Sequence, residues 1–522
     1  MVEETAKLDP GRFHPAPLPR WERKLSFAVW IVHSLGAFYL AYLACTGPLR
    51  LWFNDDLHRS PYIRGWLVDP TDSEWHNFML NLRWAMWLSR SLSYRFLSAD
   101  QARLVQIAVG FVLHAWVTSF TCMFVLAAFA LITIGLSVHF RREFIAWILC
   151  VGFVIKVFDI APLSADYYVN YREFNMFCYG ALKIITVCTA FCRNPERQVS
   201  MDWGLSIAHY MTYLPYATVI IILYEEFVAQ IAQRTCGQRE TPFGWRSNLL
   251  FSLRLLLSTT LYTILLHMIP AGAMFASQAA TSSRLNGYQL FSLAYVIGQY
   301  FHVKYVVLFG VSSLFARIDG MTPPPPPICI SRVSRYSRMW RHFDAGLYSF
   351  LKNQVYIPLL TNPYLKSGMA RPLALVSAFL IVVAWHGSHR NCVVWVCLSA
   401  FELVIERSIG LGAGIREPEP SSSLHFQEFR ARTGEVWLRR MLACCMNLTV
   451  LYNGLLGIAK MDFTIVNGVP SAGLVLAHLL TLGYFFNQTC LELEFANRKV
   501  AEKNNNNKDN NNDNNNVKEK LS

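Results

Sequence analysis

The stretch Met339–Leu347 reads MWRHFDAGL, and it is one of the few places where charge and aromatic rings interrupt an otherwise apolar chain. It carries a single carboxylate, Asp344. Downstream, the apolar run Pro372–Ala384 ends abruptly in the tripeptide Trp-His-Gly, whose histidine is His386. An ionisable side chain at the end of such a run is costly unless it lines a wet cavity. Asp344 and His386 are therefore the first candidates for a functional site, and the rest of the chain is interpreted as the wall around them.

The composition excludes an ordinary soluble protein. The chain has 522 residues, of which 53% are hydrophobic and only 16% charged, and its mean hydropathy is +0.28. The apolar residues come in blocks long enough to cross about 30 Å of hydrocarbon, which takes roughly 20 helical residues. The first apolar run, Leu25–Cys45, is too long for the core of a cleavable signal peptide. The sequence therefore predicts an all-α polytopic membrane protein.

We expect about ten membrane-spanning helices with one or two re-entrant pieces, between a basic cytosolic leader (residues 1–24) and a disordered Asn-rich tail (residues 495–522). Val105–Val138 is too long for one untilted helix and could form a span plus a re-entrant piece. The Trp-rich connection Gly47–Leu104 suits helices that lie in the membrane interface. The other predicted spans are Leu25–Cys45, Glu143–Val157, Phe174–Cys192, Leu205–Phe227, Asn248–Met268, Tyr288–Phe315, Pro372–Ala384, Cys392–Ile409, Leu438–Ile458 and Gly468–Phe486.

The net charge of +13 invites a nucleic-acid interpretation, but the Lys and Arg residues lie in the loops between apolar runs. That distribution is typical of cytosolic loops and of surfaces that meet anionic lipids. It predicts membrane lipids and the phosphates of an acyl-CoA as partners, and no nucleic acid. The thirteen cysteines form no CxxC pair and mostly lie in apolar runs, which indicates small buried side chains.

Polar residues near the signature stretch admit two interpretations each. Gln299, Tyr300, His302, Lys304 and Tyr305 lie within a predicted span and either form a hydrogen-bond network in the bundle or line a reaction chamber. The arginines after the five prolines at 323–327 recur every three residues, and either reach lipid headgroups or cradle a CoA pyrophosphate. They are Arg332, Arg335, Arg338 and Arg341. The loop thiol of Cys329 could be a metal or haem ligand, a palmitoylation site or inert.

The pair of candidate residues suits base-assisted acyl transfer. A neutral imidazole can take a proton from an attacking amine, hydroxyl or thiol. Attack on a thioester builds an oxyanion that needs a fixed donor or cation nearby. Asp344 would orient the nucleophile or His386, or hold a positively charged amine. Taken alone, a histidine at a helix end is also consistent with a structural role.

Several motifs together resemble the membrane-bound O-acyltransferase superfamily, and within it the hedgehog acyltransferase branch. The resemblance covers about Tyr288–Gly410. The matching segments are MWRHFDAGL at 339–347, YIP at 356–358, GQYFHVKYVVLFGV at 298–311, DG at 319–320, CISR at 329–332 and WHG at 385–387. The chain departs from the superfamily just before Tyr224, where Ile-Ile-Leu stands in place of a Gly-Pro pair. The resemblance therefore does not decide whether the chain forms a re-entrant segment there.

The resemblance implies a bundle with a central tunnel over residues 25–494. It implies transfer of palmitate from palmitoyl-CoA to the amino group of the N-terminal cysteine of Hedgehog, in the membrane of the endoplasmic reticulum or Golgi. By position, His386 and Asp344 are the catalytic residues, Trp340 gates the acyl tunnel, and Arg341 lies near the CoA. Arg338 and His302 are added as substrate-binding candidates, and Cys329 as a haem ligand. The branch includes a relative that lost the histidine, whereas His386 is present here.

Three other functions remain open at this point. The acceptor could be a lipid or sterol hydroxyl or another secreted peptide, which a Hedgehog peptide with a blocked amine would test. The chain could be a non-catalytic regulator of Hedgehog, in which case alanine at His386 and Asp344 would leave its cellular effect intact. A solute transporter is disfavoured because transporters usually show repeated halves, and no internal repeat is evident.

Overall fold

The computed structural model describes most of residues 18–408, with gaps at 47–53, 62, 73, 80–98, 236–242, 277–284, 331–332, 334–335 and 387–389. It also describes some helical residues within 437–444 and 474–496. The helices are α1 (Arg20–Thr46), α4 (Ala99–Val117), α5 (Phe120–Phe140), α6 (Glu143–Ile160), α7 (Tyr167–Cys192), α8 (Met201–Thr212), α9 (Tyr224–Thr235), α10 (Trp245–Met268), α11 (Ala271–Ala276), α13 (Gly287–Ile318), α14 (Tyr336–His342), α15 (Ala345–Phe350), α16 (Ile357–Leu360), α17 (Ser367–His386) and α18 (Arg390–Ser408).

The shorter elements are two 3-10 turns, a π-helix and a small hairpin. They are η1 (Asn54–Asp56), η3 (Leu214–Tyr216), the π-helix η5 (Leu351–Tyr356), and the antiparallel strands β1 (His58–Arg59) and β2 (Leu67–Val68). The hairpin turn includes Gly65 at φ +83°, a conformation that favours glycine. The prediction of interfacial helices in Gly47–Leu104 thus missed this hairpin. Much of that stretch lies outside the described residues.

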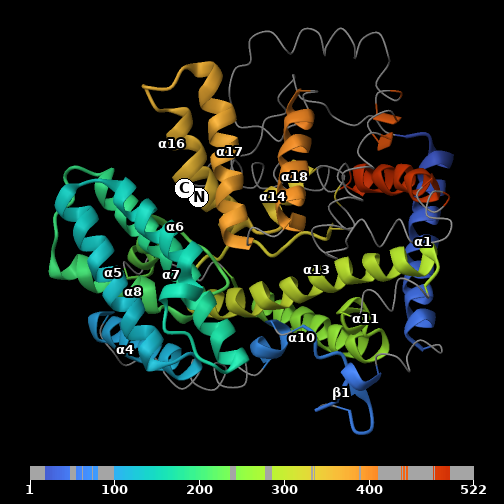
Figure 1. Cartoon of the computed structure of the whole chain (residues 1–522), viewed down its shortest axis with the longest axis horizontal. Coiled ribbons are helices and arrows are strands. Elements are labelled where there is room, and N and C mark those ends of the chain that lie inside the picture. The colour runs from blue at the N-terminus through green and yellow to red at the C-terminus, as the bar shows by residue number, and fades with distance from the viewer. Residues whose placement is uncertain are drawn as a thin grey trace, which may run out of the picture.

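Helix α13 is the central element of the arrangement (Figure 1). Helices α1 and α10 pack on it, whereas α5 and α6 pack on α7 in a second group. Two apolar cores result, one around α1, α10, α11 and α13 and the other around α5 to α9. The 32 residues of α13 are long enough to reach from one core to the other.

Many helix starts are fixed by side chains that satisfy free backbone N–H groups. Ser119 caps α5, Asp166 caps α7 and Ser200 caps α8. Asn286 and Gln289 form a capping box at the start of α13. These caps lie at the polar breaks between apolar runs, which is why the elements begin there.

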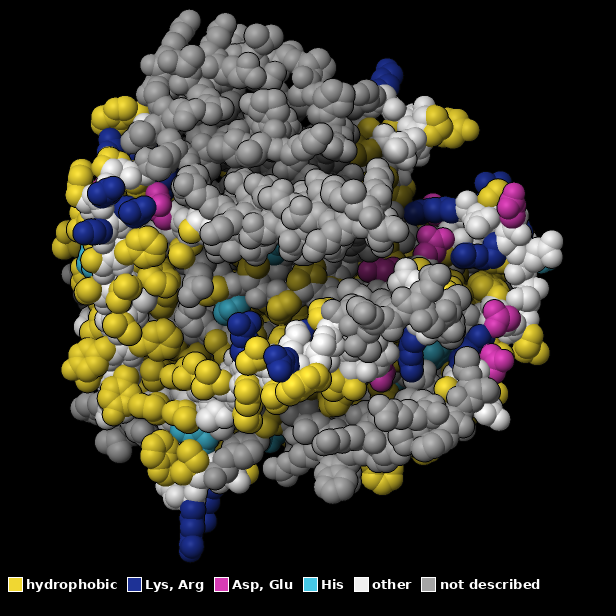
Figure 2. Space-filling model, turned by 180° about the vertical axis from the view of Figure 1, so that it is seen from behind, with side chains coloured by type: hydrophobic (Ala, Val, Ile, Leu, Met, Phe, Trp, Pro, Cys, Tyr) yellow, Lys and Arg dark blue, Asp and Glu magenta, His cyan; other side chains and the backbone are white. Residues whose placement is uncertain are grey.

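The described helices confirm an all-α polytopic membrane protein. Six are long and apolar enough to cross a membrane, namely α1, α5, α7, α10, α13 and the Gly368–His386 part of α17. Large apolar side chains such as Leu257 and Leu131 are about three-quarters exposed on them. Figure 2 shows the broad apolar surface that results, with Lys and Arg gathered at a few places. Such a surface suits lipid rather than water.

The structure settles some predicted spans and corrects one. Val105–Val138 is two helices, α4 and α5, joined at residues 118–119. Leu205–Phe227 is not one span: α8 ends at Thr212, the chain continues through η3 and a non-helical stretch, and α9 starts at Tyr224. Pro215 lies in η3, where its missing N–H removes a helical bond. The predicted spans Leu438–Ile458 and Gly468–Phe486 lie largely outside the described residues.

Candidate active site

Asp344 lies at the turn between α14 and α15 and begins the second of these helices. Its side chain accepts a hydrogen bond of 2.8 Å from the backbone N–H of Leu347, as an N-cap residue does. Helix α15 continues without a break through the π-helix η5 into α16. A π-turn inside a helix is uncommon and often accompanies a functional site. The candidate carboxylate is therefore held by the backbone of its own signature stretch.

A small cavity adjoins Asp344. Its volume is about 10 Å³, on the order of what one water molecule occupies by this measure. The wall is formed by residues 219–221, Phe309 and Ser313 of α13, Pro324 and Pro325, and residues 344–346. Asp344, which is half-buried, thus lines a hollow whose wall is otherwise made of mostly apolar side chains and backbone.

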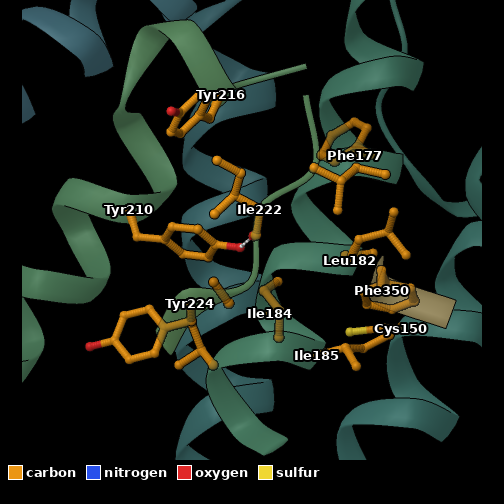
Figure 3. Packing of buried hydrophobic residues seen from close by; sticks show 14 of the residues in the cluster. Cys150, Phe177, Leu182, Ile184, Ile185, Tyr210, Tyr216, Ile222, Tyr224 and Phe350 are labelled. Carbon is orange, nitrogen blue, oxygen red and sulfur yellow. Dashed lines mark hydrogen bonds between the residues drawn. The ribbon is translucent and has the colours of Figure 1, made fainter. Parts of the chain in front are cut away.

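The non-helical stretch 217–223 forms one wall of this cavity and is itself buried. The hydroxyl of Tyr210 donates a hydrogen bond to the backbone oxygen of Ile222, which Figure 3 shows among packed apolar side chains. Gly346 lies so close that a Cβ there would be 2.4 Å from the oxygen of Ile221. Non-helical backbone within a membrane protein is tolerated where it is buried in protein. Only glycine at 346 allows this approach.

The polyproline segment forms a second wall and is held at its start. Gly320, at φ +77°, turns the chain after α13. The amide of Gln230 bonds Thr322 twice, donating to its oxygen at 3.1 Å and accepting from its N–H at 3.0 Å. Tyr213 donates to Asp319 at 2.9 Å. The prolines are therefore fixed against α9 rather than forming an exposed linker.

Burial changes the acidity of Asp344. The loss of solvent around the carboxyl raises its pKa to about 6, while the backbone N–H groups of Leu347 and Gly346 act in the opposite direction. Tyr179 of α7 is close enough to interact electrostatically with Asp344. The ring of Tyr179 also meets Trp385 edge to face, with centroids 5.0 Å apart. Tyr179 therefore lies between Asp344 and the last turn of α17.

His386 is the final residue of α17 and is exposed, in contrast to the enclosed carboxylate. Its ring meets Trp395 of α18 edge to face at 5.5 Å. Trp395 stacks on Trp340 at 5.8 Å, and Trp340 also contacts Phe379 of α17 at 5.3 Å. The structure thus joins His386 and the predicted tunnel residue Trp340 through one aromatic group.

The other predicted substrate residues do not lie on the wall of the cavity beside Asp344. Arg341 places its guanidinium over the ring of Tyr348 at 5.7 Å and is half-buried. Arg338 is half-buried on α14, and His302 is half-buried on α13. Arg332 and Arg335 lie outside the described residues, so the proposed CoA cradle stays a prediction.

The polar residues of α13 make a network within the bundle. The ammonium of Lys304 lies 2.9 Å from Glu74 and 3.1 Å from Asp72. Tyr305 donates to Glu74 at 3.1 Å, and Tyr300 donates to two backbone oxygens in α10 and just after it. Charges of opposite sign remain buried because they are paired. Asp72 and Glu74 could not be predicted to meet α13, since they lie more than 200 residues away from Lys304.

Cys329 has a half-buried thiol at the end of the proline segment. The nearby N–H of Ile328 donates to the oxygen of His342, which holds this loop against α14. No group of three or more metal-binding side chains occurs among the described residues, and the cavity beside Asp344 does not extend to Cys329. One thiol does not define a haem site, and no step below depends on haem.

Sequence reasoning identified Asp344, Trp340 and His386 but missed several residues around them. Tyr179, Trp395 and the backbone at 219–221 come from distant parts of the chain. A continuous apolar run gave no signal for the break at 217–223. Ser313 was not singled out because a serine within a span usually satisfies its own hydroxyl locally.

Comparison with known proteins gives consistent results. A family model described as MBOAT, the membrane-bound O-acyltransferase family, matches residues 114–412. The mouse (Mus musculus) protein-cysteine N-palmitoyltransferase HHAT is 27% identical over 418 residues, covering 75% of this chain and 82% of the mouse protein. The Drosophila melanogaster protein-cysteine N-palmitoyltransferase Rasp is 37% identical over 116 residues, which are 22% of this chain and 23% of Rasp. The mouse protein-cysteine N-palmitoyltransferase HHAT-like protein is 25% identical and covers 67% of each chain.

Proposed function

The chain belongs to the membrane-bound O-acyltransferase family, and from this premise we propose that it transfers palmitate from palmitoyl-CoA to the N-terminal cysteine amine of a Hedgehog protein. Two relatives carry the name protein-cysteine N-palmitoyltransferase, and one of them aligns with three-quarters of the chain. The Hedgehog acceptor rests on the signature at 339–347 and its resemblance to that branch. A secreted acceptor places the reaction in the membrane of the endoplasmic reticulum.

The observation that supports the proposal most is the setting of Asp344. A carboxylate that caps a helix beside an enclosed hollow is fixed in direction before any substrate arrives. Fixed polar groups in a site poor in water act strongly on developing charge. Asp344 would hold and orient the acceptor amine, which carries a positive charge until it loses its proton.

The chemistry requires one base and one orienting group. The amine nitrogen attacks the thioester carbonyl carbon, the C–N bond forms, and the C–S bond breaks to release CoA. The ammonium form of the amine first loses one proton to solvent. As the neutral amine attacks, His386 would take the second proton from the nitrogen and deliver it to the departing CoA sulfur. The aromatic group of Trp340, Trp395 and Phe379 offers apolar surface for the palmitoyl chain. The cavity beside Asp344 is too small to hold that chain.

Purified full-length protein in detergent tests the proposal directly. Labelled palmitoyl-CoA and a Hedgehog N-terminal peptide should give hydroxylamine-resistant, amide-linked palmitate. An N-acetylated peptide should accept none. Folded protein that binds palmitoyl-CoA but acylates only a lipid hydroxyl or another peptide would change the acceptor. Folded protein that acylates nothing would favour the non-catalytic regulator.

His386→Ala needs a control that removes a similar side chain elsewhere. His139 is suitable because it is also an exposed histidine in the last turn of a helix, α5. The proposal requires that His386→Ala loses the product and that His139→Ala retains it. Equal activity of the two variants would remove His386 from the mechanism.

A further inference from the structure

Ser313 has a buried hydroxyl in the wall of the cavity beside Asp344. The residue lies on α13 and is only 2% exposed. Within the described part of the chain, its oxygen makes no hydrogen bond. Some hydroxyls in the helices bond the oxygen four residues earlier, as Thr259 does with Leu255 and Ser252 does with Asn248, both at 2.8 Å. Ser313 shares the missing bond with Thr133 of α5 and differs from it in lining the cavity beside Asp344.

The hollow can satisfy that hydroxyl through a bound water. An unpaired buried polar group costs about 1–3 kcal/mol, so native proteins pair such groups with protein or water. The cavity has room for one water molecule, and a buried water needs two to four polar partners. The wall supplies the hydroxyl, the Asp344 carboxylate and the buried backbone of residues 219–221.

The backbone of this wall also has N–H groups without a backbone acceptor among the described residues. Among the described residues, the N–H groups of residues 219–222 donate no backbone hydrogen bond. Buried backbone groups are nearly always paired, and ordered water is one of the usual partners. Ser313, Asp344 and residues 219–221 therefore line the same small space.

We propose that Ser313 and Asp344 together hold a water molecule in this cavity, and that Ser313 acts through it as a positioning residue for the carboxylate. The consequence for catalysis rests on the proposed function. The serine hydroxyl and a backbone N–H of residues 219–221 donate to the water, and the water donates a hydrogen to the carboxylate. The carboxylate gains a donor on the side facing the cavity, which stabilises its ionised form and fixes its direction.

Among the described residues, Tyr179 of α7 is a titratable side chain that interacts with Asp344 electrostatically. The cavity wall contributes Phe309 and Ser313 from α13, and apolar side chains from residues 219–221 and the two prolines. Within the described residues of that wall, no charged group besides Asp344 is present. Loss of the water should therefore change the titration of the Asp344 carboxylate.

The test measures the titration of Asp344 without needing turnover. Infrared spectroscopy follows the C=O stretch of the protonated carboxylic acid, and the band of Asp344 is the one that Asp344→Asn removes. In Ser313→Ala its midpoint should rise by about one pH unit, because the ionised form loses a hydrogen bond. Ser312→Ala, which changes the neighbouring serine outside the cavity wall, should leave the midpoint unchanged. Ser313→Thr keeps a hydroxyl and should stay close to the wild-type protein.

Turnover gives a second, separable readout. With kcat measured from pH 5 to 8.5, Ser313→Ala should lose about 3-fold near pH 6.5 and less than 2-fold at pH 8.5. An unchanged infrared midpoint in Ser313→Ala overturns the water bridge, as does an equal loss of kcat at every pH. A wild-type protein that forms no palmitoyl amide contradicts the proposed function, and the infrared result still decides the role of Ser313.

Discussion

Asp344 and His386 belong to one predicted catalytic pair, but the structure surrounds them differently. Asp344 caps a helix, faces a cavity of about 10 Å³ and is closed in by residues 219–221 and by two prolines. His386 ends its helix in the open, with its ring against the edge of Trp395. Asp344 lies among backbone and apolar side chains, whereas the imidazole of His386 is exposed and contacts Trp395.

This difference suggests separate tasks for the two residues. A group that orients a nucleophile has to be held in place before binding, because a small misplacement costs much of the rate. A base that passes a proton from the amine to the leaving sulfur benefits from access to both. The enclosed carboxylate suits the first task and the exposed imidazole the second.

Removal of the base should have the largest effect on rate and little on stability. His386→Ala is expected to lower kcat on the order of 1,000-fold, within the range of general-base catalysis. Its thermal midpoint should stay within about 1 °C of the wild-type value, because the side chain is exposed. The measurements are amide-linked palmitate per unit time and thermal unfolding in the same detergent. A large drop in the midpoint would mean that the open end of α17 is structural.

Asp344→Asn should lower kcat about 100-fold while keeping the helix start. Asparagine still accepts the hydrogen bond from Leu347, so the cap survives, but it loses the charge that would hold the amine. Asp166→Asn is a matched control because Asp166 also caps a helix, α7, and is exposed. A comparable loss of kcat in both variants would show that the effect comes from the caps.

The fold class could be predicted from the sequence, whereas the catalytic pair stays a prediction. Apolar blocks of helical length define the membrane class whatever their packing, and the charged interruptions at Asp344 and His386 stand out against them. The resemblance at 339–347 then added the family, which the match over residues 114–412 confirms. These features are local, so one chain is enough to read them.

The surroundings of the pair could not be predicted, because they come from contacts between distant segments. The stretch 217–223 lies about 120 residues before Gly346, and nothing local distinguishes its three isoleucines from a membrane helix. Lys304 could be recognised as a costly charge in a span, but its partners Asp72 and Glu74 could not. The exposure of His386 likewise depends on how α17 and α18 pack.

The pH dependence of kcat should reveal the enclosed member of the pair. Burial raises the pKa of Asp344 to about 6, so the carboxylate is ionised above pH 6 and becomes neutral as the pH falls through that value. If the ionised form orients the amine, kcat falls about tenfold per pH unit below 6 from this group alone. A histidine base that must be neutral makes the fall of kcat toward low pH steeper still. In Asp344→Asn, kcat should therefore fall less steeply at acidic pH than in the wild-type protein. An equally steep fall in both proteins would exclude Asp344 as a titrating group.

The smallest effect tests whether the enclosure itself is rigid. Alanine at Gly346 would place its Cβ 2.4 Å from the oxygen of Ile221 and 3.2 Å from its nitrogen, and both atoms are backbone. Relief requires a shift of α15 or of the buried stretch, so Gly346→Ala should cost about 1–3 kcal/mol of stability. Gly204 in α8 has nothing within 4 Å of an added Cβ, and alanine there should stabilise the helix slightly. Thermal unfolding of the two variants makes the comparison. If Gly346→Ala is as stable as Gly204→Ala, the backbone beside Asp344 shifts at little cost. The Asp344 carboxylate would then be no more rigidly held than the imidazole of His386.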